Sequence, residues 1–124
     1  MTDLHVVVTG GAGFIGGNLC RLLLATPGVA SVRVIDDLST GNRANLDGLD
    51  VHFVEGTILD DDALDTAFAG ATSVVHLAAL GSVPRSVAAP LPTHHANGTG
   101  TVMVLEAARR HGNLHTIVAS SSSV

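Results

Sequence analysis

Four glycines near the N-terminus have the spacing of turns that bind phosphate groups. Two spacings fit the run, namely Gly11-x-Gly13-x-x-Gly16 and Gly10-x-x-Gly13-x-x-Gly16. In either spacing, glycine permits a tight turn and a close approach of the backbone to a pyrophosphate. The helix that follows then offers free N–H groups and the positive end of its dipole to those phosphates. The spacing therefore indicates a dinucleotide site, and the alternative is a set of glycines that serve only the turn.

Two aspartates follow the second apolar run of the chain, Val32–Ile35. A carboxylate at the position of Asp36 accepts hydrogen bonds from both hydroxyls of an adenosine ribose and repels a 2′-phosphate, so NAD is favoured over NADP. Arg33 and Arg43 weaken this preference, because a nearby arginine accommodates that phosphate. Asp36 as a solvated helix or turn cap is the alternative. Asp37 is a neighbouring candidate contact, and a bystander role is favoured for it.

The histidines and the single cysteine are expected to have structural roles. His94 and His95 are adjacent, so on a helix they point in different directions and do not share a metal in the i, i+4 manner. No metal site is therefore expected. His76 lies in an apolar run and is predicted to be a packed core histidine. Cys20 has no second cysteine to pair with and lies in a leucine-rich helical pattern, which predicts a buried, inert thiol.

Strands and helices alternate along the chain and position these residues. Short β-branched and apolar runs predict five strands, at Leu4–Thr9, Val32–Ile35, Val51–Val54, Ser73–Leu77 and Leu114–Ala119. Helical spacing predicts helices at Phe14–Thr26, Asp60–Phe68 and roughly Thr93–His111. Two segments are expected to lack regular structure, namely Leu38–Gly48, with a helical turn at most, and the loop Ala79–Pro92, punctuated by Gly81, Pro84, Pro90 and Pro92.

This alternation predicts an α/β fold, a doubly wound (Rossmann) parallel sheet with strand order 3-2-1-4-5. Residues 1–124 are expected to form one NAD-binding domain. Ligands of such sheets lie over the carboxyl ends of the strands, where the glycine turn and Asp36 both fall. The sequence therefore predicts one site at one edge of the sheet.

Composition excludes several other classes of protein. The chain has 124 residues, is 46% apolar, and carries a formal net charge of −5 without a basic cluster, which argues against a nucleic-acid partner. No apolar run is long enough to span a bilayer, and no basic stretch followed by an apolar one opens the sequence, so no membrane association is expected. With one cysteine, the compartment is expected to be the cytoplasm.

Over its whole length the sequence resembles the extended short-chain dehydrogenases, the NAD-dependent epimerase/dehydratase group. Five segments carry the resemblance in the family's order, namely TGGAGFIG, VIDDLSTGNRANL, VVHLAALGSVPRSV, ANGTGT and VASSSSV. It implies a doubly wound NAD domain followed by a smaller domain that binds a nucleotide-sugar, so the chain is expected to be truncated before the later strands and that substrate domain. The long helix carries an apolar stripe, Val102, Met103, Leu105 and Ala108, most of which core packing explains. The resemblance also implies a homodimer, in whose interface this helix often lies.

The resemblance implies cofactor contacts along the carboxyl edge of the sheet. The residues that match the family's cofactor segments are Gly10, Gly13, Phe14, Ile15, Gly16, Asp36, Asp37, Ser39, Thr40, Gly41, Thr57, Ile58, Leu77, Ala78, Ala79 and Asn97. Thr57 departs from the family, which usually has an aspartate there whose carboxylate contacts adenine. Threonine offers a single hydroxyl in its place. For Asn97, a helix cap or a local packing role is an equal alternative.

The serine run at the end of the sequence resembles the family's Ser-Ser-x-x-Val segment. Aligned on Val124, Ser121 falls where the family has its catalytic serine or threonine, whose hydroxyl hydrogen-bonds the reacting sugar hydroxyl. Ser122 takes that place if the register slips by one residue. A simple turn at the end of a strand is a further alternative.

The same segment bears on the type of reaction. Family 4,6-dehydratases carry Asp-Glu directly after the catalytic hydroxyl residue, where this chain has Ser122 and Ser123, so dehydration is disfavoured. The loop 80–86 resembles that of bacterial UDP-glucose and UDP-N-acetylglucosamine 4-epimerases. The expected parent protein is therefore a UDP-hexose 4-epimerase that transfers hydride transiently at C4 through a 4-keto sugar. Alternatives are another extended short-chain dehydrogenase, namely a nucleotide-sugar dehydratase, decarboxylase or reductase, or a non-catalytic NAD-binding regulator.

The family's Tyr-x-x-x-Lys pair has no counterpart in this sequence. The 124 residues include neither a tyrosine nor a lysine. In the family the tyrosine takes the hydroxyl proton, and the lysine lowers the pKa of that tyrosine. The chain alone is therefore expected to be inactive.

Overall fold

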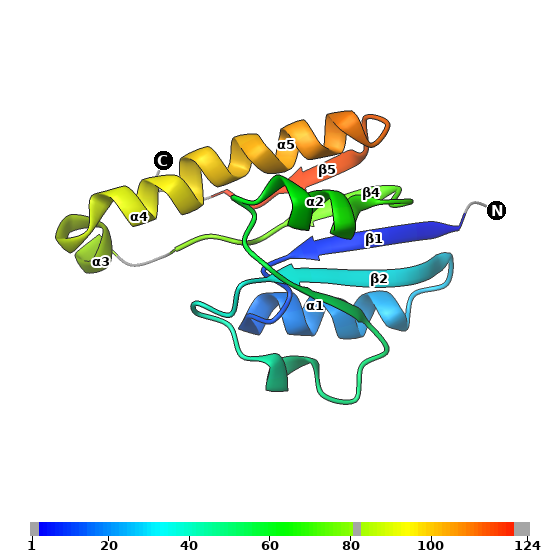
Figure 1. The fold of residues 1–124 in the computed structure, drawn as a ribbon. Coiled ribbons are helices and arrows are strands. Elements are labelled where there is room, and N and C mark those ends of the chain that lie inside the picture. The colour runs from blue at the N-terminus through cyan, green and yellow to red at the C-terminus, as the bar shows by residue number, and fades with distance from the viewer. Residues whose placement is uncertain (1–2, 81–82, 121–124) are drawn as a thin grey trace.

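A computed structural model describes residues 3–80 and 83–120 of the chain. In this part, five strands form one sheet in the order β3-β2-β1-β4-β5, and all four neighbouring pairs are parallel (Figure 1). The predicted fold class and strand order are thus confirmed. No helix in the described part is long and apolar enough to cross a membrane.

The strands are short and lie close to their predicted positions. Their bounds are β1 Leu4–Thr9, β2 Val29–Asp36, β3 His52–Glu55, β4 Ser73–His76 and β5 His115–Val118. β2 begins earlier than the predicted Val32 because its first residues pair with the start of β1, where Leu4 lies opposite Val29. The apolar run over 32–35 does not by itself indicate that the strand begins three residues earlier.

The helices differ from prediction in one region. Their bounds are α1 Phe14–Leu24, α2 Asp61–Phe68, α3 Val83–Ala88, α4 Pro90–His94 and α5 Gly100–Arg110, with a 3₁₀ turn η1 at Arg43–Leu46 and a π-helical turn η2 at His95–Thr99. The predicted loop over 79–92 is wrong, because it holds α3 and the start of α4. Pro90 and Pro92 lie in the first turn of α4, where a backbone N–H has no helical partner, so proline begins this helix and does not break it.

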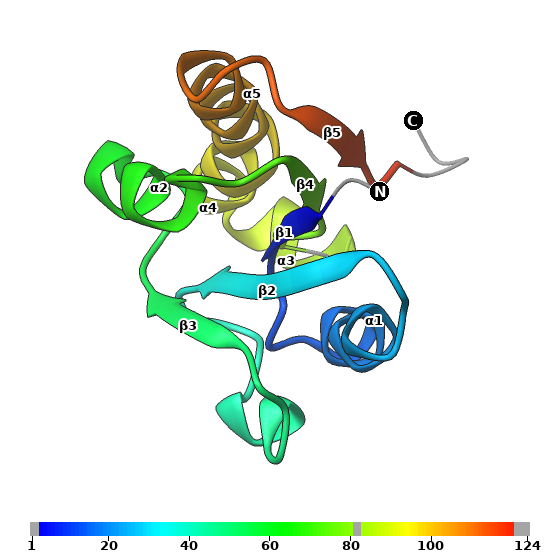
Figure 2. The same ribbon diagram turned by 90° about the vertical axis from the view of Figure 1, so that its right-hand side faces the viewer.

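Helices cover both faces of the sheet, α1 on one face and α2 with α5 on the other (Figure 2). Side chains of the central strands alternate between the two layers. Val6, Val8 and Val34 pack in the cluster on the α1 side, whereas Val7 and Ile35 pack in the cluster with α2 and α5. Neither face of β1 meets water, which explains the unbroken apolar run of its sequence.

Cys20 lies in the cluster on the α1 side and is fully buried, as predicted. Burial raises the pKa of its thiol to about 11. At neutral pH the group is therefore a thiol and a packing element, because the reactive form of cysteine is the thiolate.

Candidate functional site

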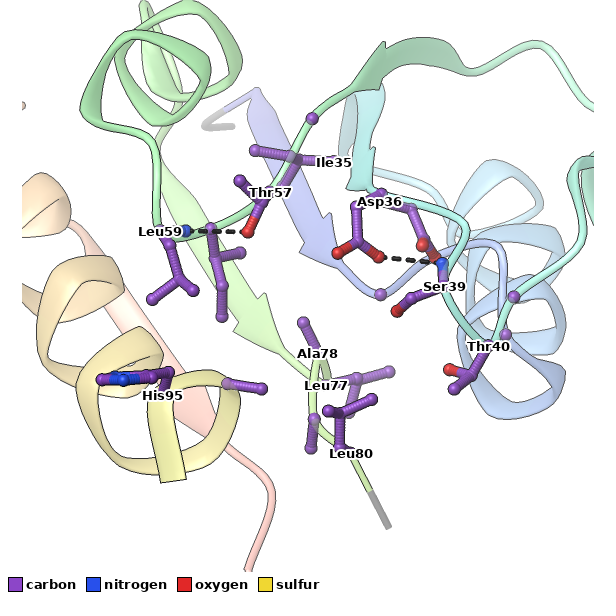
Figure 3. A pocket seen from close by; sticks show the side chains of 18 of the residues that line it. Ile35, Asp36, Ser39, Thr40, Thr57, Leu59, Leu77, Ala78, Leu80 and His95 are labelled. Carbon is purple, nitrogen blue, oxygen red and sulfur yellow. Dashed lines mark hydrogen bonds between the residues drawn. The ribbon is translucent and has the colours of Figure 1, made fainter. Parts of the chain in front are cut away.

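The described residues form an open pocket at the carboxyl edge of the sheet, with a volume of about 420 Å³ (Figure 3). It is lined by the segments that directly follow β1, β2, β3 and β4, and by one helical wall. Its residues are Gly10, Gly13, Ile35, Asp36, Asp37, Ser39, Thr40, Gly41, Gly56, Thr57, Ile58, Leu59, Leu77, Ala78, Ala79, Leu80, Pro92, His95 and Ala96. The strand ends thus meet where a doubly wound sheet binds its ligands.

Gly10 begins the glycine turn in a conformation that favours glycine. Its φ is +71°, and a Cβ placed there would lie 2.9 Å from the Cα of Ala78. Its N–H donates to the carbonyl of Ile35, and its own carbonyl accepts from Gly13. The turn is therefore clamped between the ends of β2 and β4, with no room for a side chain.

The first turn of α1 presents its N–H groups without a competing partner from a side chain. Gly13 is the N-cap, and in the described chain neither a side-chain cap nor an acidic residue occupies this turn. A Cβ on Gly16 would lie 2.6 Å from the Cα of Gly11, so α1 packs directly against the turn. Of the predicted contacts, Gly16 and the exposed Phe14 and Ile15 do not line the pocket.

Asp36 is buried, and its carboxylate is held by two backbone donors. One carboxylate oxygen, Oδ2, accepts from Ala12 N at 2.9 Å, and Oδ1 accepts from Leu38 N at 2.8 Å. Each oxygen retains a further lone pair. Asp36 thus serves as a turn cap and still offers two fixed acceptors to a ligand, so the two sequence interpretations are compatible.

Asp37 is exposed and lines the same pocket, and it shapes the loop that follows. Its carboxylate accepts from Ser39 N at 3.0 Å. Ser39, Thr40 and Gly41 form the outer wall beyond it, and a Cβ on Gly41 would lie 3.0 Å from Asp36 Oδ2. Four of the predicted contacts, Asp37, Ser39, Thr40 and Gly41, therefore line the pocket after Asp36.

Two arginines near this corner are engaged away from the pocket. Arg33 Nη1 donates to the carbonyl of Ala67 at 2.7 Å and also to that of Ala69. Arg43 lies over the ring of Phe53, with its guanidinium carbon 4.5 Å from the ring centroid. Neither side chain lines the pocket, so among its described residues the acidic side chains face no lysine or arginine.

Thr57 and Ile58 form the wall after β3. Thr57 Oγ1 accepts from Leu59 N at 3.1 Å, so its hydroxyl closes a local turn and its hydrogen remains free to donate. Ile58 is buried and packs against Gly100, where a Cβ would lie 2.5 Å from Ile58 Cδ1. This wall is mostly apolar.

The wall after β4 consists of Leu77, Ala78, Ala79 and Leu80. Leu80 belongs to the pocket although the sequence analysis did not single it out. Asn97 does not line the pocket, since both ends of its amide bind the backbone of Leu80: Oδ1 accepts from Leu80 N at 2.7 Å, and Nδ2 donates to Leu80 O at 2.8 Å. The geometry thus gives Asn97 the local packing role.

A helical wall closes the pocket opposite β2 and was missed by the sequence analysis. Pro92 of α4 and His95 and Ala96 of η2 line it (Figure 3). Pro92 and Ala96 are four residues apart, so they share one helical face. That spacing would have revealed the wall if the helix had been predicted to start at Pro90.

The catalytic candidate Ser121 and its alternative Ser122 lie outside the described residues. His94 and His95 have ring centroids 6.0 Å apart. In the described part of the chain, no three histidine, cysteine, aspartate or glutamate side chains lie close enough to hold a metal ion.

Comparison with known proteins gives consistent matches. The model of the "NAD dependent epimerase/dehydratase family" matches residues 6–124. UDP-glucose 4-epimerase of Bacillus subtilis is 37% identical over 98% of this chain and 38% of its own length. dTDP-glucose 4,6-dehydratase of Mycolicibacterium smegmatis is 38% identical over 92% of this chain and 36% of its own length.

Solved structures agree with these sequence matches. The crystal structure of UDP-glucose 4-epimerase from Brucella ovis in complex with NAD is 36% identical and superposes with a TM-score of 0.87. The match covers 98% of this chain and 37% of that one. The chain thus spans less than two fifths of the length of these three relatives.

Proposed function

The chain belongs to the NAD dependent epimerase/dehydratase family, and on that premise we propose that its pocket binds NAD. The observation that carries the proposal is Asp36, a buried carboxylate at the end of β2 with both oxygens fixed and both still able to accept. Such a carboxylate accepts hydrogen bonds from the two hydroxyls of an adenosine ribose.

The rest of the pocket fits the remaining parts of a dinucleotide. The uncapped first turn of α1, approached closely through Gly10 and Gly13, suits a pyrophosphate. The apolar walls around Ile58 and Ala78 suit the faces of a base. The hydroxyl of Thr57 replaces the carboxylate that relatives are expected to use toward adenine, so that contact is reduced to a single hydrogen bond.

NAD is preferred over NADP because the two arginines that would accommodate a 2′-phosphate are occupied. Arg33 is bound to carbonyls at the end of α2, and Arg43 covers Phe53. The part of the pocket proposed to hold the ribose then contains the carboxylates of Asp36 and Asp37 and, among its described residues, no lysine or arginine. A dianionic phosphate placed there would be repelled.

Calorimetric titration with NAD and NADP tests this proposal. We expect the protein to bind NAD more tightly than NADP, and Asp36→Asn to weaken NAD binding by at least roughly tenfold, which corresponds to about 1.4 kcal/mol. Asp50→Asn is the matched control, because Asp50 is exposed and outside the pocket. Equal NAD affinity of the wild-type and Asp36→Asn proteins would overturn the assignment of the ribose to this carboxylate.

For the whole protein we propose a nucleotide-sugar 4-epimerase acting on a UDP-hexose. Bound NAD supplies an acceptor for the hydride that leaves C4 of the sugar. The residues of this chain hold and orient the cofactor, and Ser121 is proposed to hydrogen-bond the reacting sugar hydroxyl. Support comes from Ser122 and Ser123, which stand where dehydratases of the family carry their acid and base.

A dTDP-sugar 4,6-dehydratase is the second candidate, because a dehydratase and an epimerase are equally similar to this chain. Assays of the whole protein distinguish them. An epimerase converts UDP-glucose into its C4 epimer, which NMR of the anomeric protons detects. A dehydratase instead forms a 4-keto-6-deoxy sugar from dTDP-glucose, and that product would refute the epimerase proposal.

We further propose that the whole protein is a homodimer that pairs through α5. Val102 and Leu105 of the predicted stripe are exposed on this helix, whereas Ala108 is buried in the chain's own core. Exposed apolar side chains on one helix are typical of a surface that is covered in an assembly.

A further inference from the structure

A buried chain of hydrogen bonds runs behind the wall that follows β4. It begins at Thr9, the last residue of β1, whose side chain is fully buried. Thr9 Oγ1 accepts from Leu77 N at 3.0 Å and from Ala78 N at 3.1 Å. Leu77 N also reaches the Thr9 carbonyl, at 3.1 Å. The hydroxyl therefore fixes the first two residues of the pocket wall.

His76 connects this hydroxyl to the helical layer. Its Nδ1 lies 2.6 Å from Thr9 Oγ1, and its Nε2 lies 3.1 Å from Thr101 Oγ1 on α5. Thr101 Oγ1 in turn donates to the carbonyl of Asn97 at 2.6 Å. Because Asn97 holds Leu80 through both ends of its amide, the chain of bonds reaches both ends of the wall 77–80.

The bonding partners fix where each hydrogen lies. Thr9 Oγ1 accepts two N–H groups, so both of its lone pairs are used and its own hydrogen is left for His76 Nδ1. Nδ1 is therefore unprotonated, and Nε2 carries the hydrogen that Thr101 accepts. The hydrogen of Thr101 goes to the carbonyl of Asn97, so each hydroxyl and the ring N–H of this chain of bonds has one acceptor.

We propose that His76, held as the neutral Nε2–H tautomer between Thr9 and Thr101, is a positioning residue that fixes the wall 77–80 for the cofactor. The proposal rests on the proposed NAD site. His76 does not line the pocket itself. It acts on the pocket through the Thr9 hydroxyl, which holds the backbone N–H groups of Leu77 and Ala78. Burial lowers the pKa of His76 below its ordinary value, which agrees with a neutral ring. A second proton, placed on Nδ1, would face a hydroxyl with no lone pair left.

The tautomer is tested first, by long-range proton–nitrogen NMR of the histidine rings in the purified protein. His76 is assigned by its absence from the spectrum of His76→Phe or, if that variant does not fold, of His76→Gln. We expect Nδ1 to resonate as an unprotonated nitrogen and Nε2 as a protonated one. The opposite tautomer, or an imidazolium at neutral pH, would overturn the proposal. This readout requires no NAD, so it stands apart from failure of the proposed function.

The positioning role is tested by NAD affinity in three variants. His76→Phe removes both bonds, and we expect its NAD affinity to fall by roughly tenfold. His76→Asn restores an acceptor near Nδ1 and should recover part of that loss. Thr101→Val leaves His76 Nε2–H unpaired and should weaken NAD binding even if His76→Phe does not fold.

Two results distinguish a failure of the positioning role from a failure of the proposed NAD site. A wild-type protein that fails to bind NAD refutes the proposed function. A wild-type protein that binds NAD, with folded His76→Phe or Thr101→Val variants of unchanged affinity, refutes only the positioning role. Loss of affinity in His76→Phe without any recovery in His76→Asn would also count against it, because a purely steric role predicts that result.

Discussion

Polar side chains in and beside the pocket bind backbone groups. Asp36 receives two main-chain N–H groups, Thr9 receives two, and Asn97 binds both polar groups of one residue. Side chains that bind backbone fix the shape of loops, and loops carry most ligand contacts in such sheets. The pocket is therefore ordered by its polar residues before any ligand arrives.

Gly10 gives a prediction at this scale. Alanine at Gly10 must adopt a φ of +71° and place a Cβ 2.9 Å from the backbone of Ala78. Gly28 has a φ of +92° with no atom within 4 Å of such a Cβ, so Gly28→Ala isolates the conformational cost. We expect Gly28→Ala to lower the free energy of unfolding by about 1–2 kcal/mol and Gly10→Ala by roughly 3 kcal/mol or more.

Urea denaturation of the two variants measures the difference. If Gly10→Ala loses no more stability than Gly28→Ala, then the turn moves freely away from β4. That result would contradict the tight contact between the glycine turn and the backbone of Ala78.

From the sequence alone, the position of several pocket residues could be predicted from their type and their place after a strand. Asp36 and the glycines were predictable because a turn after one strand and an acid after the next have fixed geometric meaning in a parallel sheet. The engagement of Arg33 was not predictable, because its partners are carbonyls 34 and 36 residues away. The same holds for Asn97, whose amide is committed to Leu80 across a loop.

At the scale of elements, α2 and α5 are joined by an ion-pair cluster at the end of the core. Asp65 of α2 accepts from Arg110 Nη2 at 3.0 Å and lies 2.8 Å from His111 Nε2. The hydrogen bonds from His111 and then from Arg110 hold the pKa of Asp65 below its ordinary value of 3.8. The charged carboxylate therefore stabilises the packing of these two helices.

This lowered pKa predicts a pH dependence. The contribution of Asp65 is present above the ordinary carboxyl pKa of 3.8 and is lost as the pH falls through the lowered pKa of the folded state. We expect Asp65→Asn to melt at a lower temperature than wild type at neutral pH, with the difference vanishing in acid. Thermal melts between neutral and acid pH measure it.

Asp62→Asn is the matched control for this series. Asp62 lies in the same helix, is exposed, and forms no ion pair with the described residues. Its replacement should leave the melting curves nearly unchanged. A difference between wild type and Asp65→Asn that persists undiminished in acid would show that the cluster does not act through the charge.

The strands were predictable as elements, whereas α3 and the start of α4 were not. Buried parallel strands leave unmistakable β-branched runs, as in β1. Proline obscured α3 and α4, because it has opposite meanings inside a helix and in its first turn. The π-helical turn η2 has no compositional signature, since it arises from a change of hydrogen-bond partner.

For the molecule as a whole, β5 is one of the two edge strands of the sheet in the described residues, and β3 is the other. Ile117 of β5 lies opposite Val75 of β4 in the sheet, and its side chain is still 55% exposed. Exposed edges and apolar patches favour association between molecules. We therefore predict that the 124-residue chain self-associates in solution.

Light scattering of two lysine variants tests the edge. Ile117→Lys places a charge on the edge strand and should lower the apparent mass. Leu22→Lys is the control, because Leu22 is 64% exposed on α1, away from that edge. A stable monomer of the wild-type chain, or an equal effect of both variants, would refute a role of β5.

The order of the sheet and the place of its pocket followed from the sequence because right-handed crossovers leave few arrangements for alternating strands and helices. The extent of the pocket did not follow. Its far wall comes from a segment that follows β4 by more than a dozen residues, and that wall depends on how α4 and α5 are joined.

The junction between α4 and α5 determines which face of α4 is turned toward the pocket. In η2 the N–H of Gly100 donates to the carbonyl of His95, five residues earlier, so the turn holds one residue more than an α-helix allows. If the same residues formed ordinary α-helical turns, α4 would be rotated by about 100° relative to α5. Pro92 and His95 would then turn out of the pocket. The far wall is thus set by the width of a single helical turn, which takes up one extra residue and keeps α4 facing the pocket.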